Sequence, residues 1–174
     1  MARQESILLF GEGKTEAVFL SHLRTVYAGR IQARVNLDAG QGGSPKQVAS
    51  RLIKKHLKLG AYDRSLLLID DDLPTTEIPA SWRRNHKITV ITSAPMCLEG
   101  LLLTLLDDAP PPRERLLARN WKRRFHRRHL DTDRSSDVVN RLKKKCPELF
   151  PLDLIEARRN AIPALRDVLE FIRV

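Results

Sequence analysis

The sequence predicts an α/β fold, in which a mostly parallel, doubly wound sheet of about four strands is flanked by helices. Short apolar runs alternate with segments of helical periodicity through roughly the first 106 residues. The runs are apolar throughout, as expected for parallel strands that helices cover on both faces. With 174 residues, of which 42% are hydrophobic, the chain is long enough to bury a core and is not a disordered polymer.

Two predicted strand–helix units occupy the N-terminal third of the chain. Residues 6–10 form a buried strand, and the turn GEGKTE leads from it into a helix with apolar positions at helical spacing. A second strand is predicted over residues 31–37. After it, Ser44 is placed to cap, and Pro45 to open, a helix that ends at Gly60.

Two further units follow. Residues 65–69 form an apolar strand that runs into three consecutive aspartates, and residues 74–82 are expected to be irregular. A strand is predicted over residues 87–92, with a helix start at residues 93–95. The prolines that follow then break the alternation.

The segment DDAPPPR at residues 107–113 indicates a boundary, because three consecutive prolines favour an extended connector. We therefore divide the chain into an α/β core (residues 1–108) and a proline-containing connector with a basic helical extension packed on that core (residues 109–174). A last helix is expected to begin near Pro163.

The charge of the chain favours a polyanionic partner. Its formal net charge is +10, and residues 113–145 hold thirteen Lys or Arg against four acids. Trp121 and Phe125, four residues apart on a predicted helix, are expected to face inward. The cations around them are then free to bind a phosphate backbone, with these candidates: Arg123, Arg124, Arg127, Arg128, Lys143, Lys144 and Lys145. The lysine run is expected to end a helix before Pro147, and His126 and His129 are interpreted as surface histidines.

Acidic residues gather where predicted strands end. Asp70 and Asp72 are one residue apart, so in an extended backbone their carboxylates point to the same side. Glu12 and Glu16 follow the first strand, and parallel strands end at one edge of the sheet. Converging carboxylates repel each other unless a cation lies between them, and hard oxygen ligands suit one or two Mg²⁺ or Mn²⁺ ions.

The turn GEGKTE does not match a phosphate-binding P-loop, because Leu8 stands where that motif needs its first glycine. Lys14 in this turn either meets a phosphate or is simply solvated, and the sequence leaves both readings open.

Taken together, these motifs resemble the Toprim domain shared by topoisomerases, primases and several nucleases. The similarity is greatest to RloB-like and OLD-family nucleases: EGKTE followed by Phe19, a Gly-Gly-Ser-Pro loop, the DxD pair, and an SxPxxxE motif that ends at Glu99. The resemblance covers roughly residues 6–106 and implies a Toprim-like, Rossmann-like fold. A topoisomerase or primase would need further domains that this sequence does not supply.

The resemblance implies a Mg²⁺- or Mn²⁺-dependent nuclease that cleaves DNA or RNA, with a role in bacterial or phage defence. Glu12, Asp70 and Asp72 match the family's catalytic, metal-binding acids. Glu16 and Glu99 match acids that help to hold a second metal, although Glu99 would also suit the first turn of a helix for electrostatic reasons alone. A separately encoded ATPase is a candidate partner.

Two other functions remain open. A nucleic-acid-binding module with a degenerate acidic cluster would keep the basic segment but would show no metal-dependent turnover. A receiver-like signalling domain, with Lys87 as its lysine, would need an acidic pair after the first strand, where this chain has Glu12.

The sequence predicts a cytoplasmic protein without membrane contact. The N-terminal apolar run is too short for the core of a signal peptide, and no run approaches the ~20 residues of a membrane span. Cys97 and Cys146 have neither the spacing of a zinc site nor that of a disulfide framework.

Overall fold

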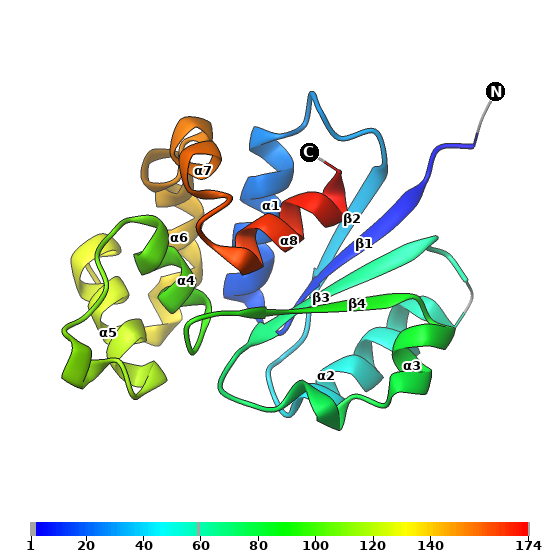
Figure 1. The fold of residues 1–174 in the computed structure, drawn as a ribbon, viewed down its shortest axis with the longest axis horizontal. Helices are drawn as coiled ribbons and strands as arrows, with labels where there is room; N and C mark the ends of the chain where they lie inside the picture. Colours follow the sequence, from blue (N-terminus) through cyan, green and yellow to red (C-terminus); the bar gives the residue numbers. More distant parts are fainter. Residues whose placement is uncertain (1–2, 59, 174) are drawn as a thin grey trace.

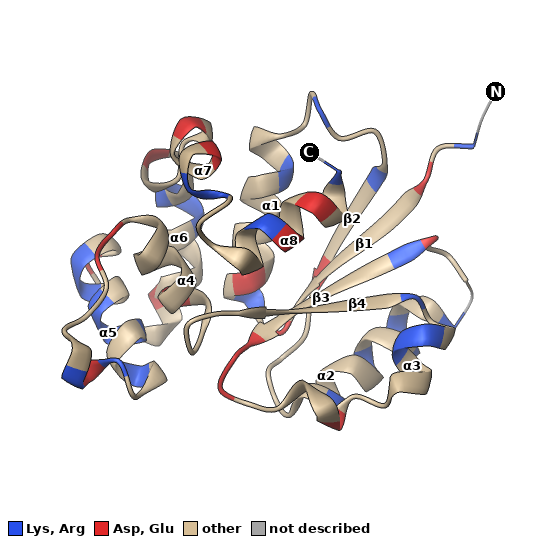
Figure 2. Cartoon of the chain, viewed as in Figure 1, with Lys and Arg blue, Asp and Glu red and all other residues tan. Residues whose placement is uncertain are grey.

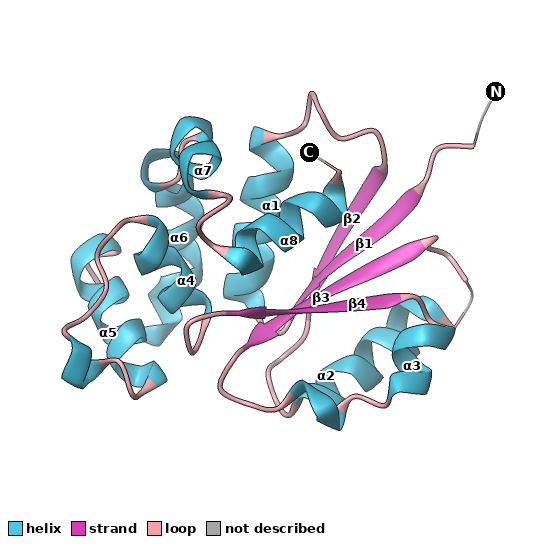
Figure 3. Cartoon of the chain, viewed as in Figure 1, coloured by secondary structure: helices cyan, strands magenta, loops and turns pink. Residues whose placement is uncertain are grey.

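The computed structural model describes residues 3–58 and 60–173 and contains a four-stranded parallel sheet with helices on both faces (Figure 1, Figure 3). The strand order is β2 (Arg34–Ala39), β1 (Ser6–Gly11), β3 (Arg64–Asp70), β4 (Ile88–Ser93). Every neighbouring pair is parallel. The predicted α/β class and parallel sheet are therefore confirmed, and the arrangement is consistent with a Rossmann-like fold.

Two hydrophobic clusters cover the two faces of the sheet. One face packs against α2 (Pro45–Leu52) and α3 (Ala80–Asn85). The opposite face carries α1 (Lys14–Val26) and the helices that follow β4. The apolar runs of β1 and β3 supply side chains to both clusters, which explains why these strands do not alternate with polar residues.

Helices account for most of the chain after β4. They are α4 (Leu98–Leu105), α5 (Ala118–His129), α6 (Ser135–Leu149), α7 (Leu152–Arg158) and α8 (Pro163–Ile172). Short 3₁₀ turns form at Thr75–Glu77 and Pro112–Glu114, and the π-helical turn Ile53–Leu57 continues α2. The last helix begins at Pro163 as predicted.

Residues on both sides of the proline segment share one hydrophobic cluster. Trp121 and Phe125 of α5 are 2% and 1% exposed, and they pack in the same cluster as Leu98 and Leu102 of α4. The prediction that both aromatic side chains face inward is confirmed. The helices after residue 109 therefore complete the cover of one sheet face.

Several expected element bounds were wrong. The helix expected to start at residues 93–95 begins at Leu98, because Ser93 still belongs to β4. The second strand begins at Arg34 rather than at residue 31, because Arg34 is the partner of Ser6, the first residue of β1. Part of the segment expected to be irregular forms α3, which begins directly after Pro79. Helix α6 also continues through Pro147, since a proline this close to the helix end removes a single backbone hydrogen bond. The helical segment expected to end at Gly60 ends at Leu57, the last residue of the π-helical turn that continues α2.

In the described ranges, no helix is both long and apolar enough to cross a membrane.

Candidate functional site

Glu12 lies in a tight turn at the carboxyl end of β1. Its backbone N–H donates to the carbonyl of Leu68 (2.8 Å), and its Oε2 accepts a hydrogen bond from the N–H of Asp70 (3.0 Å). The turn requires glycine at two positions that pack closely against other atoms. A Cβ at Gly11 would lie 2.7 Å from the N atom of Ala17, and one at Gly40 would lie 2.6 Å from the carbonyl oxygen of Glu12. These glycines allow Glu12 to approach the end of β3.

Glu16 is buried in the first turn of α1. Its Oε2 accepts from the N–H of Gly13 at 2.9 Å, and the hydroxyl of Thr15 lies 3.2 Å from both carboxylate oxygens. Burial raises the pKa of Glu16 to about 7, and the charges of Asp70 and Glu99 add to the effect. Glu16 therefore caps the helix and also interacts with the other carboxylates near the ends of the strands. We call this group the acidic edge: Glu12, Glu16, Asp70, Asp72 and Glu99.

Asp70 is the last residue of β3 and is 7% exposed. Its Oδ1 accepts from the hydroxyl of Ser93 (3.1 Å) and from the N–H of Leu98 (3.0 Å). The chain turns immediately afterwards, so Asp71 and Asp72 are exposed. The extended geometry expected for Asp70 and Asp72 is therefore wrong, because the strand ends between them.

Two side chains of α5 reach the acidic edge. The ammonium of Lys122 lies 3.1 Å from Oδ2 of Asp70, with side-chain exposures of 40% and 9% for the two residues. Nε2 of His126 lies 3.2 Å from Oε1 of Glu99, a buried residue of α4. His126 is thus not a free surface histidine, and the acidic edge already has a cationic partner.

The pKa values show that the acids influence one another. Burial raises the pKa of Glu12, and the charges of Asp70 and Asp72 raise it further. Burial also raises the pKa of Asp70, with Lys122 opposing and Glu99 reinforcing this shift. Burial alone would lower the pKa of Lys122, but the carboxylates of Asp70 and Glu99 outweigh it and raise that pKa.

Glu99 differs from the other buried acids. Burial by itself would raise its pKa, yet the hydrogen bond from His126 and the charge of Lys122 hold it below its usual value. All five predicted acids therefore interact electrostatically with at least one other member of the set. Figure 2 shows acidic residues where β3 ends.

Electrostatic interaction among the acids does not by itself make a metal-binding site, which also needs several ligand atoms grouped around one point. Over residues 3–58 and 60–173, no three His, Cys, Asp or Glu side chains are grouped so that they could hold an ion. Lys122 and the hydrogen bonds to Ser93 and Leu98 occupy both oxygens of Asp70. Glu12 Oε1 and the Asp72 carboxylate, in contrast, have no hydrogen-bond partner in the part of the chain that the structure describes.

The basic residues of α5 divide into two kinds. Arg124, Arg128 and His129 all bind the carboxylate of Asp108, with distances of 2.5, 2.8 and 2.9 Å, and fix α5 to the chain just before the three prolines. His129 is therefore a structural residue and not a free surface histidine. Arg123 is exposed and has no ion-pair partner among the described residues.

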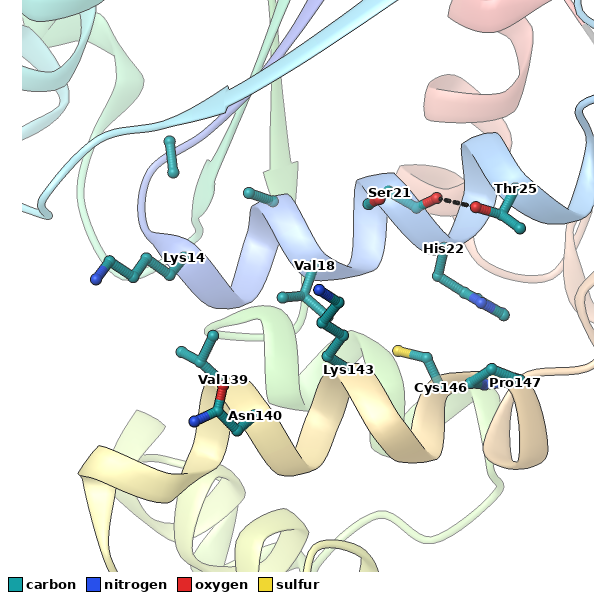
Figure 4. Close-up of a pocket in the computed structure, with 12 residues that line it drawn as sticks. Lys14, Val18, Ser21, His22, Thr25, Val139, Asn140, Lys143, Cys146 and Pro147 are labelled. Atoms are coloured by element: carbon teal, nitrogen blue, oxygen red, sulfur yellow. Dashed lines mark hydrogen bonds between the residues drawn. The ribbon is translucent and has the colours of Figure 1, made fainter.

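The remaining predicted phosphate-binding residues also differ. Arg127 and Lys145 form exposed ion pairs with Asp133 and Asp131. Lys14, Lys143 and Lys144 are exposed and have no ion-pair partner within the described part of the chain. Lys14 and Lys143 line the same cleft between α1 and α6 (Figure 4).

The sequence reasoning did not find Lys122, His126 or Ser93 as members of the acidic edge. A weak signal for two of them existed: Lys122 and His126 each follow a buried aromatic residue of α5 by one position. They therefore form a second stripe beside the apolar one. Which element that stripe meets depends on how α5 docks, which its own sequence does not determine.

Comparisons of the chain with models of known protein families, with curated proteins and with solved structures found no significant match.

Proposed function

We propose that this protein is a divalent-metal-dependent phosphoesterase of Toprim type that cleaves DNA or RNA. The observation that carries the proposal is the group of buried or half-buried carboxylates with raised pKa at the carboxyl edge of a parallel sheet, directly beside a basic helix. In open α/β sheets, ligands bind at this edge. Perturbed carboxylates in such a position are typical of functional sites.

The donors fit a hard divalent cation by their chemistry, although they are not arranged as a finished ligand set. Glu12 and Asp72 would hold the ion, since Glu12 Oε1 and the Asp72 carboxylate are unpartnered among the described residues. Asp70 would join them if Lys122 released its Oδ2. Glu16 and Glu99 remain candidates for a second ion. A bound Mg²⁺ or Mn²⁺ would polarise the scissile phosphate and make bound water more acidic.

The chain's own residues have distinct tasks in this proposal. Glu12 and Glu16 are both candidates for accepting a proton: Oε1 of Glu12 serves either as the metal ligand or as the proton acceptor, while both oxygens of Glu16 accept hydrogen bonds. Lys122, once released from Asp70, would bind a non-bridging phosphate oxygen. Arg123 and Lys144 would neutralise the backbone of the nucleic acid away from the reacting phosphate.

Asp72 offers the sharpest test, because it is exposed and its neighbour Asp71 is an exposed aspartate that serves as a matched control. We expect Asp72→Asn to lower metal-dependent cleavage of labelled single- and double-stranded DNA and RNA by at least ~10-fold. Asp71→Asn is expected to stay within ~3-fold of the parent. Equal cleavage by parent and Asp72→Asn would refute the role of Asp72 as a ligand.

A second function, binding of nucleic acid without catalysis, is favoured by one specific observation. The ammonium of Lys122 neutralises Asp70 internally, so the acidic edge does not need a metal to be stable. In that case no nucleic acid is cleaved with Mg²⁺ or Mn²⁺, and neither metal raises the melting temperature. Binding of nucleic acid through the basic residues would persist.

A further inference from the structure

A cleft of about 510 Å³ separates α1 from α6, next to the acidic edge but distinct from it (Figure 4). This volume is in the range of small-ligand sites. The cleft combines aliphatic walls with hydrogen-bonding groups and two ammonium groups, and its main lining residues are Val18, His22, Val139, Asn140, Lys14 and Lys143.

The two lysines give the cleft an uncompensated positive charge. Lys14 comes from the start of α1 and Lys143 from the middle of α6, and both line the cleft. Neither has an ion-pair or hydrogen-bond partner in the ranges that the structure describes. Many other cations of this basic chain are paired, as Arg124 and Arg128 are with Asp108. The charge therefore favours an anionic ligand.

His22 supplies a hydrogen-bond acceptor. Its Nε2 lies 2.7 Å from the carbonyl oxygen of Phe150, which can only accept, so Nε2 carries the proton and Nδ1 is the acceptor. Burial lowers the pKa of His22, which favours this neutral form. Asn140 adds a carboxamide that both donates and accepts. Asn140 lies at the Lys14 end of the cleft and His22 at the opposite end, so a ligand that fills the cleft would meet these two side chains with different parts (Figure 4).

The order of these groups along α1 matches a ligand with a charged end and a hydrogen-bonding end. Lys14 lies near one end of the cleft and His22 toward the other (Figure 4). Eight residues separate them along the helix, a rise of about 12 Å. Val18 lies between them and provides an apolar surface.

We propose that this cleft binds one nucleotide, with its phosphate between Lys14 and Lys143, at the end where Asn140 also lies, and its base edge at His22. The nucleotide is either a free nucleoside monophosphate or one unit of a strand. The second case rests on the proposed function, because Lys14 is two residues from Glu12, so a strand cut at the acidic edge would place its neighbouring nucleotide here.

The test is to measure the affinity of the full chain for AMP, GMP, CMP and UMP by calorimetric titration, at low salt and in the presence of a metal chelator. The four nucleosides and inorganic phosphate are titrated in parallel. We expect at least one monophosphate to bind more tightly than its nucleoside and than phosphate, since each of these offers only half of the contacts. Lys143→Ala should weaken that binding about tenfold, and Asn140→Ala should weaken it by a smaller factor. Lys46→Ala, which removes an exposed lysine of α2 on the other face of the sheet, is the control and should change binding less than twofold or so.

Three outcomes would overturn the proposal: no binding of any monophosphate by the parent, phosphate binding as tightly as the nucleotides, or equal effects of Lys143→Ala and Lys46→Ala. A short single-stranded oligonucleotide identifies the source of the nucleotide. If it binds more tightly than the monophosphate and loses that gain in Lys143→Ala, the cleft takes a unit of a strand. If it does not, the ligand is a free nucleotide.

The chelator keeps this test separate from the test of the nuclease. Nucleotide binding without any metal-dependent cleavage would refute the proposed function and leave the cleft proposal standing. Cleavage that depends on Asp72, in a protein that binds no nucleotide, would refute the cleft proposal and leave the proposed function standing.

Discussion

Lys122 is expected to stabilise the fold by neutralising the acidic edge, and Lys122→Met tests this most directly. Methionine keeps much of the length and apolar stem of lysine but leaves the Asp70 carboxylate, whose side chain is 9% exposed, without its cation. Removing one partner of a buried pair costs about 3–5 kcal/mol. Because the Lys122 side chain is 40% exposed, water screens part of this effect. We therefore expect the free energy of unfolding to fall by about 2 kcal/mol.

For a chain of this length, such a loss lowers the melting temperature by roughly 4 to 8 °C. Guanidinium unfolding and thermal melts of the metal-free protein measure it, with Lys144→Met as the control, because Lys144 is exposed and without an ion-pair partner among the described residues. Adding Asp70→Asn to Lys122→Met should recover part of the loss, since it removes the uncompensated charge.

Mg²⁺ adds a second readout. If the edge accepts a cation, Mg²⁺ should raise the melting temperature of Lys122→Met more than that of the parent, because the ion no longer competes with the ammonium. Should Lys122→Met unfold at the same denaturant concentration as Lys144→Met, the electrostatic account of the edge is refuted.

Three further predictions concern single side chains. Because the folded pKa of Glu16, about 7, lies above its unfolded value of 4.5, its contribution to stability is present below about pH 4.5 and is lost as the pH rises through 7. The free energy of unfolding of Glu16→Gln should therefore rise by roughly 3 kcal/mol, relative to that of the parent, when the pH is raised from about 4 to about 8. Denaturant unfolding of both proteins at the two pH values measures this difference, and finding none would contradict the prediction. Arg123→Ala should reduce the salt dependence of duplex DNA binding by about 0.9 counterions, whereas Arg124→Ala, which breaks the pairing with Asp108, should lower stability and leave the slope unchanged. Phe125→Ala should lower the free energy of unfolding by about 3–5 kcal/mol, and a loss below ~1 kcal/mol would mean that α5 is not part of the core.

The sheet and the convergence of the acids could be predicted because both follow from local patterns. β1 and β3 are apolar throughout, so their strand character and burial are evident from the chain itself. Once both strands are known to be parallel, Glu12 and Asp70 must lie at the same edge. This part of the prediction needed no knowledge of how the helices pack.

The partners of those acids could not be predicted in the same way. Lys122 reaches Asp70 only because Trp121 and Phe125 seat α5 against α4, a contact between segments that a proline-rich connector separates. The end of β3 at Asp70 could not be predicted either, because a run of aspartates does not show whether the backbone stays extended or turns. Periodicity assigns a residue to a face of its helix, but tertiary packing decides what that face meets.

The late position of α5 in the chain also affects synthesis. Lys122 is translated 110 residues after Glu12, which at ribosomal rates is a delay of roughly ten seconds. During this interval the nascent chain can pair β1 with β3, but α1 and α4 lack the aromatic side chains that later cover them, and the carboxylates of the edge have no ammonium beside them. A chain that stalls or is cut near residue 108 would therefore expose a wide apolar surface next to a repulsive cluster of charge, and such a fragment should be a preferred target for chaperones and proteases.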